Sequence, residues 1–170
     1  MKINEYQIKA HEFAKYEDSI YPVYGLIEET GELFGKLAKE KRGDYKISKT
    51  AIDHIKIINP LDVIKELGDI CWMLSEIATQ KKITLEFNVF KINSDFNRSL
   101  INIFLALNLL CENMLLDCII TNDDFEHIFV YINRIAGFYG YSFEDVLNEN
   151  IKKLQSRKER DMINGNGDNR

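Results

Sequence analysis

The chain is poor in the two residues that most often interrupt helices, with only two prolines and nine glycines among 170 residues. Because such residues end or weaken helices, their scarcity favours long helices. Apolar residues recur with a 3.6-residue period through most of the sequence, and alternation that would allow a short strand occurs only at residues 45–58. We therefore predict an all-α fold, with residues 1–170 forming a single helical domain.

Cysteine pairs, long apolar runs and excess positive charge are also lacking. Cys71, Cys111 and Cys118 form no C-x-x-C motif and lie in apolar stretches, so we interpret all three as reduced core thiols of a cytoplasmic protein. No run of 18 apolar residues occurs and the N-terminus is polar, so neither a membrane span nor a signal peptide is expected. With a net charge of −5, nucleic acid is not an expected partner.

Apolar periodicity and capping signals predict six helices. They cover about residues 3–16, 22–41, 60–80, 96–119, 123–138 and 142–160. Asn59 followed by Pro60 is typical of a helix start, and Ser142 with Asp145 forms a capping-box-like start for the last helix. Residues 45–58 and 81–95 are expected to be connecting segments.

Two of these helices carry acidic residues at three-residue spacing. Glu29 and Glu32 share a face of the second helix, with Glu28 to one side, and Glu66 and Asp69 share a flank of the third. If the two helices pack antiparallel, four carboxylates converge, and a divalent cation would remove the cost of burying them. Mg²⁺ prefers oxygen ligands and often binds substrate phosphates as well, so the pattern suits a metal–phosphate site.

The alternative is that these acids belong to an ordinary solvated surface. Glu32 and Lys36, for example, have the spacing of an i,i+4 ion pair. Spacing alone does not decide between the two interpretations.

Two further features indicate a partner. Trp72 falls opposite the apolar stripe of the third helix, so we predict that it lines a binding site or a subunit interface. Residues 100–116 are apolar around most of a helix, which requires more cover than a chain of this length readily supplies. Both observations favour a homo-oligomer.

Four motifs follow one another in the chain. They are EETGE at 28–32, ELGDICWML at 66–74, NIKKLQSR at 150–157 and GNGDNR at 165–170. In this order they resemble the EExxE, ELGDxxW, NxxKLxxR and GxGDNR motifs of the MazG-like, all-alpha nucleoside triphosphate pyrophosphohydrolases. The resemblance covers about residues 20–80 and 140–170. The chain differs in a 33-residue spacer between the first two motifs and in a helical stretch at about 82–126, an insertion relative to compact members.

The resemblance implies a helical bundle that hydrolyses a nucleoside triphosphate between its α- and β-phosphates, giving a ribo- or deoxyribonucleoside monophosphate and pyrophosphate. It implies Mg²⁺, with Mn²⁺ as a possible substitute, and a homodimer or homotetramer. The implied Mg²⁺ ligands are Glu29, Glu32, Glu66 and Asp69. Glu28 would orient the attacking water, bind another ion or support the ligands.

The resemblance also implies contacts with the substrate. Asn150, Lys153 and Arg157 would bind its phosphates, Trp72 would line the site, and residues 165–170 would touch phosphate or a partner. Without the resemblance, Lys153 and Arg157 would be interpreted as basic residues near the end of the last helix, where positive charge complements the helix dipole. The competing function is a non-catalytic helical regulator that binds a nucleotide or a protein; the presence of all five motif carboxylates favours the enzyme.

Overall fold

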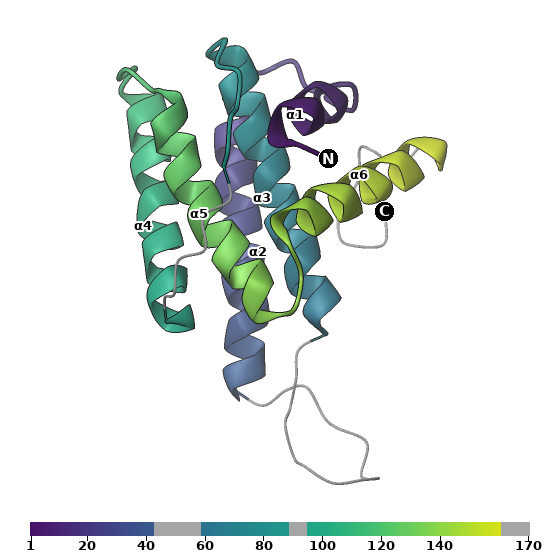
Figure 1. The fold of residues 1–170 in the computed structure, drawn as a ribbon. Coiled ribbons are helices and arrows are strands. Elements are labelled where there is room, and N and C mark those ends of the chain that lie inside the picture. Colours follow the sequence, from purple (N-terminus) through teal and green to yellow (C-terminus); the bar gives the residue numbers. More distant parts are fainter. Residues whose placement is uncertain (43–58, 89–94, 161–170) are drawn as a thin grey trace, which may run out of the picture.

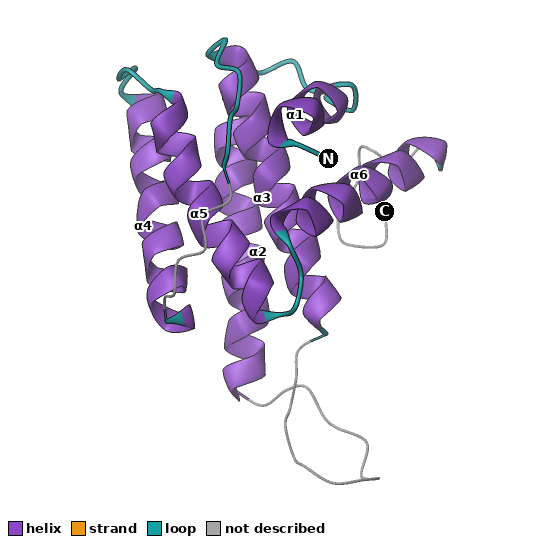
Figure 2. Cartoon of the chain, in the orientation of Figure 1, coloured by secondary structure: helices purple, strands orange, loops and turns teal. Residues whose placement is uncertain are grey.

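A computed structural model describes residues 1–42, 59–88 and 95–160 of the chain. Within them lie six helices and no strand, which confirms the all-α prediction (Figure 2). The helices are α1 (Ile3–His11), α2 (Tyr21–Arg42), α3 (Pro60–Gln80), α4 (Phe96–Leu115), α5 (Asn122–Phe138) and α6 (Phe143–Glu159). None of these described helices combines the length and apolar character that crossing a bilayer requires. The predicted connecting segment at 45–58 and the motif at 165–170 lie outside the described residues.

Helix α3 is the centre of the bundle (Figure 1). It contacts α1, α2, α5 and α6, and every residue from 66 to 78 is buried. Helices α4 and α5 pack against each other at one side, and α4 also contacts α2. The predicted apolar stripe of α3 is buried, and the faces beside and opposite it are buried as well, because a helix surrounded by others is covered on all its faces.

Two glycines allow neighbouring helices to approach α3 closely. A Cβ atom at Gly25 of α2 would lie 2.5 Å from the sulfur of Met73. A Cβ atom at Gly68 of α3 would lie 2.8 Å from the Cβ of Asn150 on α6. A larger residue at Gly68 would push α3 and α6 apart, and one at Gly25 would force the end of the Met73 side chain to move. The close approach lets short polar side chains of α2, α3 and α6 meet.

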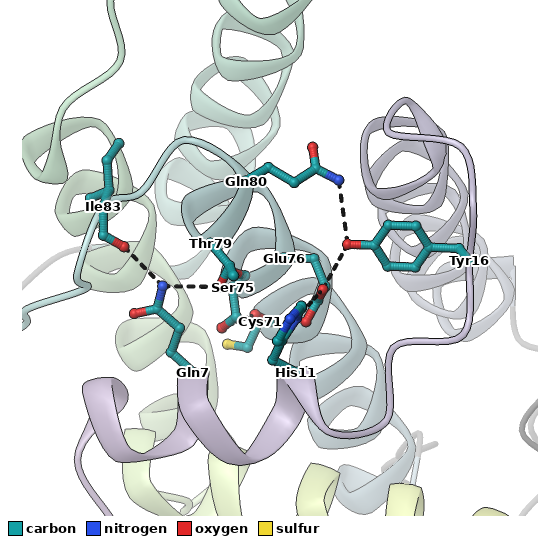
Figure 3. A network of polar contacts seen from close by, with 9 residues as sticks. All are labelled: Gln7, His11, Tyr16, Cys71, Ser75, Glu76, Thr79, Gln80 and Ile83. Atoms are coloured by element: carbon teal, nitrogen blue, oxygen red, sulfur yellow. Dashed lines mark hydrogen bonds and ion pairs between the residues drawn. The ribbon is translucent and has the colours of Figure 1, made fainter.

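Polar contacts fasten α1 and the turn after it to the C-terminal half of α3 (Figure 3). Oε2 of the fully buried Glu76 accepts a hydrogen bond from the Tyr16 hydroxyl over 2.7 Å and lies 2.9 Å from Nδ1 of His11. One turn before His11 in α1, Gln7 Nε2 donates a hydrogen bond to the Thr79 hydroxyl over 3.1 Å. These contacts compensate the burial of a carboxylate and fix α1 across α3.

Two helices end earlier than predicted. Helix α1 ends at residue 11 rather than near 16, and α4 ends at residue 115 rather than near 119. Asp117 has a φ of 53°, which a right-handed helix cannot accommodate. Cys118 therefore lies beyond the helix and is exposed, which corrects its interpretation as a core thiol; the other two thiols are buried as predicted.

Candidate metal centre

Three of the predicted ligands converge between α2 and α3. Glu29 of α2 and Glu66 and Asp69 of α3 each place a carboxylate oxygen within 4.8 Å of the other two, and all three residues are buried. We call this group the carboxylate triad. It arises because α2 and α3 run antiparallel in contact and because residues three apart in a helix share a face.

The other two acids of α2 lie outside the carboxylate triad. Glu28 and Glu32 are exposed and line a surface pocket together with Lys36 and Lys39. Glu32 stands one turn on from Glu29 and farther round the helix, away from α3. The structure therefore brings together three of the four predicted ligands, and Glu32 is near enough only for its charge to influence Glu29.

Each carboxylate that α3 contributes is paired with a lysine from a neighbouring helix. Lys36 Nζ of α2 pairs with Glu66 Oε1, and Lys153 Nζ of α6 pairs with Asp69 Oδ2. The sequence indicated Lys153 as a phosphate ligand but suggested Lys36 only as a partner of the nearby Glu32. Spacing within one helix could not reveal a partner on another helix.

Asn150 and Tyr6 hold Asp69 in position. Asn150 Nδ2 donates a hydrogen bond to Asp69 Oδ1 over 2.8 Å, and the Tyr6 hydroxyl donates to Asn150 Oδ1 over 2.6 Å. Both ends of the buried amide are thus engaged within the protein. Asn150 contacts a carboxylate of the triad, whereas the resemblance implied a direct contact with phosphate. Nothing in the sequence around Tyr6 pointed to the site.

Burial and mutual repulsion favour the protonated forms of two triad members. Burial, followed by the charges of Asp69 and Glu66, raises the pKa of Glu29 to about 8. Burial also raises the pKa of Glu66 to about 6, although its ion pair with Lys36 opposes the shift. Glu66 Oε2 is buried with no hydrogen-bond partner among the described residues. An orphaned carboxylate oxygen beside two further carboxylates is a donor set that fits a hard divalent cation such as Mg²⁺.

A pocket of about 260 Å³ between α3 and α6 adjoins the carboxylate triad through Lys153. Its lining, which we call the basic pocket, comprises Lys65, Glu149, Lys152, Lys153, Ser156, Arg157 and Arg160. Arg157 is only 4% exposed, and its Nε has no hydrogen-bond partner among the described residues. Because a guanidinium keeps its proton, a buried one needs negative charge nearby. The basic pocket therefore fits an anion.

Trp72 does not lie on an accessible face. It is 7% exposed and belongs to the core of this single chain. The structure thus corrects the expectation that the side of α3 opposite its apolar stripe is open to a base or to a second subunit.

The raised pKa of Glu29 predicts a pH dependence of stability in the absence of divalent cations. The folded protein keeps a proton on Glu29 up to about pH 8, whereas the unfolded chain releases it near the ordinary value of 4.5. Glu29 thus makes stability fall as the pH rises from about 5 to 8. We expect the free energy of unfolding to fall by about 1 kcal/mol or more less in Glu29→Gln than in the wild type over this pH range. Urea unfolding in chelator at pH 5.5 and pH 8 measures it, with the exposed Glu112→Gln as control; equal losses in all three proteins would contradict the assignment.

Comparison of the chain with protein-family models, with curated proteins and with solved structures gives no significant match in any of the three. The family resemblance of the four motifs therefore remains a prediction.

Proposed function

We propose that the protein is a Mg²⁺-dependent nucleoside triphosphate pyrophosphohydrolase that cleaves between the α- and β-phosphates. The observation that carries the proposal is the buried carboxylate triad, which adjoins the basic pocket through Lys153. The carboxylate triad suits a divalent cation, and the basic pocket suits an anion. A metal-bound polyphosphate presents both charges in one ligand.

Some residues of the chain would bind the metal ion, and others would keep its ligands in position. Glu29, Glu66 and Asp69 would hold Mg²⁺, or Mn²⁺ in its place, and Asn150 would keep Asp69 oriented. When bound, the metal neutralises phosphate charge and lowers the pKa of a coordinated water. Glu28 is exposed beside this site, and we propose it as the acid that orients the attacking water.

The basic pocket would receive the phosphate end of the substrate. Lys153 and Arg157 supply positive charge there, and the volume of about 260 Å³ lies below the range typical of pockets that enclose a whole drug-sized ligand. We therefore place only phosphate groups in it. Charge that develops on the leaving pyrophosphate would be stabilised by these cations.

The products of the reaction test the proposal. A partial digest of a nucleoside triphosphate, separated by chromatography, should contain monophosphate and pyrophosphate without diphosphate. Chelator should stop the reaction and Mg²⁺ should restore it. Asp69→Asn should lower turnover at least about a hundredfold, since the loss of a ligand exceeds the loss of a residue that supports one; Glu112→Gln should match the wild type.

Accumulation of diphosphate and free phosphate would overturn the mechanism. Failure to cleave any nucleotide would instead favour the non-catalytic regulator, in which the same fold binds a nucleotide or a protein partner.

We also propose a homo-oligomer, either a homodimer or a homotetramer, assembled through α2 and α4. An apolar groove of about 530 Å³ lies between these helices, and its lining includes two exposed apolar side chains, Ile27 of α2 and Phe104 of α4. Three further apolar side chains of α4 are exposed: Ile101, Leu105 and Leu109. Exposed apolar surface of this kind is typical of subunit interfaces. Sedimentation should therefore show an assembly at micromolar concentration, and a stable monomer would contradict the proposal.

The three free thiols, two of them buried, support a cytoplasmic location as part of the same proposal.

A further inference from the structure

The carboxylate triad is already associated with two positive charges, both from lysine side chains. Lys36 pairs with Glu66 and Lys153 pairs with Asp69, and the two lysine side chains are only 16% and 12% exposed. Solvent therefore screens these ion pairs much less than it screens pairs on the surface. In this state the lysines supply the charge that keeps two buried acids together.

A divalent cation and these lysines compete for the same carboxylates. A ligand oxygen lies about 2.1 Å from Mg²⁺, so an ammonium group paired with the same carboxylate would lie only a few ångströms from the ion. Two positive charges at that separation repel each other strongly in a buried site. A cation that binds Glu66 and Asp69 therefore weakens the ion pairs that Lys36 and Lys153 form with them.

Lys153 has a second position available to it. Besides pairing with Asp69, it lines the basic pocket next to Arg157, whose Nε has no hydrogen-bond partner among the described residues. The lysine stem has four flexible carbons, so its ammonium group can turn from Asp69 to the pocket while α6 stays in place. A phosphate oxygen in the basic pocket would then meet both Arg157 and Lys153.

We propose that Lys153 is a displaceable counter-charge: it neutralises Asp69 in the metal-free protein and turns into the basic pocket to bind a phosphate group when a divalent cation occupies the carboxylate triad. Lys36 likewise neutralises Glu66 in the metal-free protein. The inference rests on the metal site of the proposed function but not on hydrolysis. It makes the binding of cation and phosphate mutually reinforcing, because each ligand stabilises the same position of Lys153.

Manganese binding tests the competition directly. Mn²⁺ titrations followed by electron paramagnetic resonance should give a dissociation constant at least about fivefold lower for Lys153→Met than for the wild type, which is as much as the strongest exposed ion pairs are worth. Lys152→Met is the matched control, since Lys152 lines the same pocket but pairs with Glu149 and is mostly exposed; its constant should not change. An unchanged or weakened Mn²⁺ affinity in Lys153→Met would overturn the proposal.

Phosphate binding tests where the lysine goes. At saturating Mg²⁺, calorimetry with inorganic phosphate should show weaker binding to Lys153→Met than to the wild type, opposite in direction to the change in Mn²⁺ affinity. General destabilisation cannot produce opposite changes for two ligands. Unchanged phosphate affinity would show that Lys153 does not enter the basic pocket and would overturn that part of the proposal.

Two further outcomes keep the test decisive. If Lys153→Met does not fold, Lys36→Met applies the same Mn²⁺ measurement at Glu66, with the exposed Lys39→Met as its control. If wild-type protein binds no Mn²⁺, both this inference and the metal site of the proposed function fail. If it binds Mn²⁺ and the lysine variants bind it equally well, only this inference fails.

Discussion

Three carboxylates buried at one place between two helices are the constraint on which the rest of the site depends. Removing one ion from water costs several kcal/mol even after the protein relaxes, and like charges add to the cost. Lys36, Lys153 and Asn150 offset part of it through ion pairs and a hydrogen bond. The compensation is incomplete, since the pKa of Glu29 is raised to about 8. A bound divalent cation would supply the positive charge that the carboxylate triad still lacks.

The fold reaches this arrangement through close packing around α3. Gly68 lets α6 approach so near that Asn150 and Lys153, one turn apart on that helix, both reach the carboxylate of Asp69. Helix α2 meets α3 along one side only, so Glu29 is buried while the acids next to it remain exposed. The same close approach places the basic pocket beside the carboxylate triad, and Lys153 both lines the pocket and pairs with Asp69.

Local signals in the sequence predicted the parts of this structure that depend on local physics. Asn59 does cap α3 by accepting a hydrogen bond from the backbone of residue 61, and Ser142 forms the expected capping box. The spacing of Glu66 and Asp69 correctly indicated that these two acids share a helix face, whereas the spacing of Glu29 and Glu32 did not show that only Glu29 faces α3. It could not show that α3 is enclosed on all sides, which buries Trp72, or that Tyr6 reaches the site from α1. Those facts depend on which helices become neighbours, and no pattern within one helix records that.

The central claim is that the carboxylate triad holds a divalent cation, and diffraction tests it most directly. Crystals grown with Mn²⁺ should show an anomalous scattering peak at coordination distance from oxygens of Glu29, Glu66 and Asp69, with the ammonium groups of Lys36 and Lys153 moved away from them. Oxygen donors held this closely are what such a cation requires. A peak only beside the exposed Glu28 and Glu32, or no peak at a Mn²⁺ concentration that saturates the protein in solution, would contradict the account.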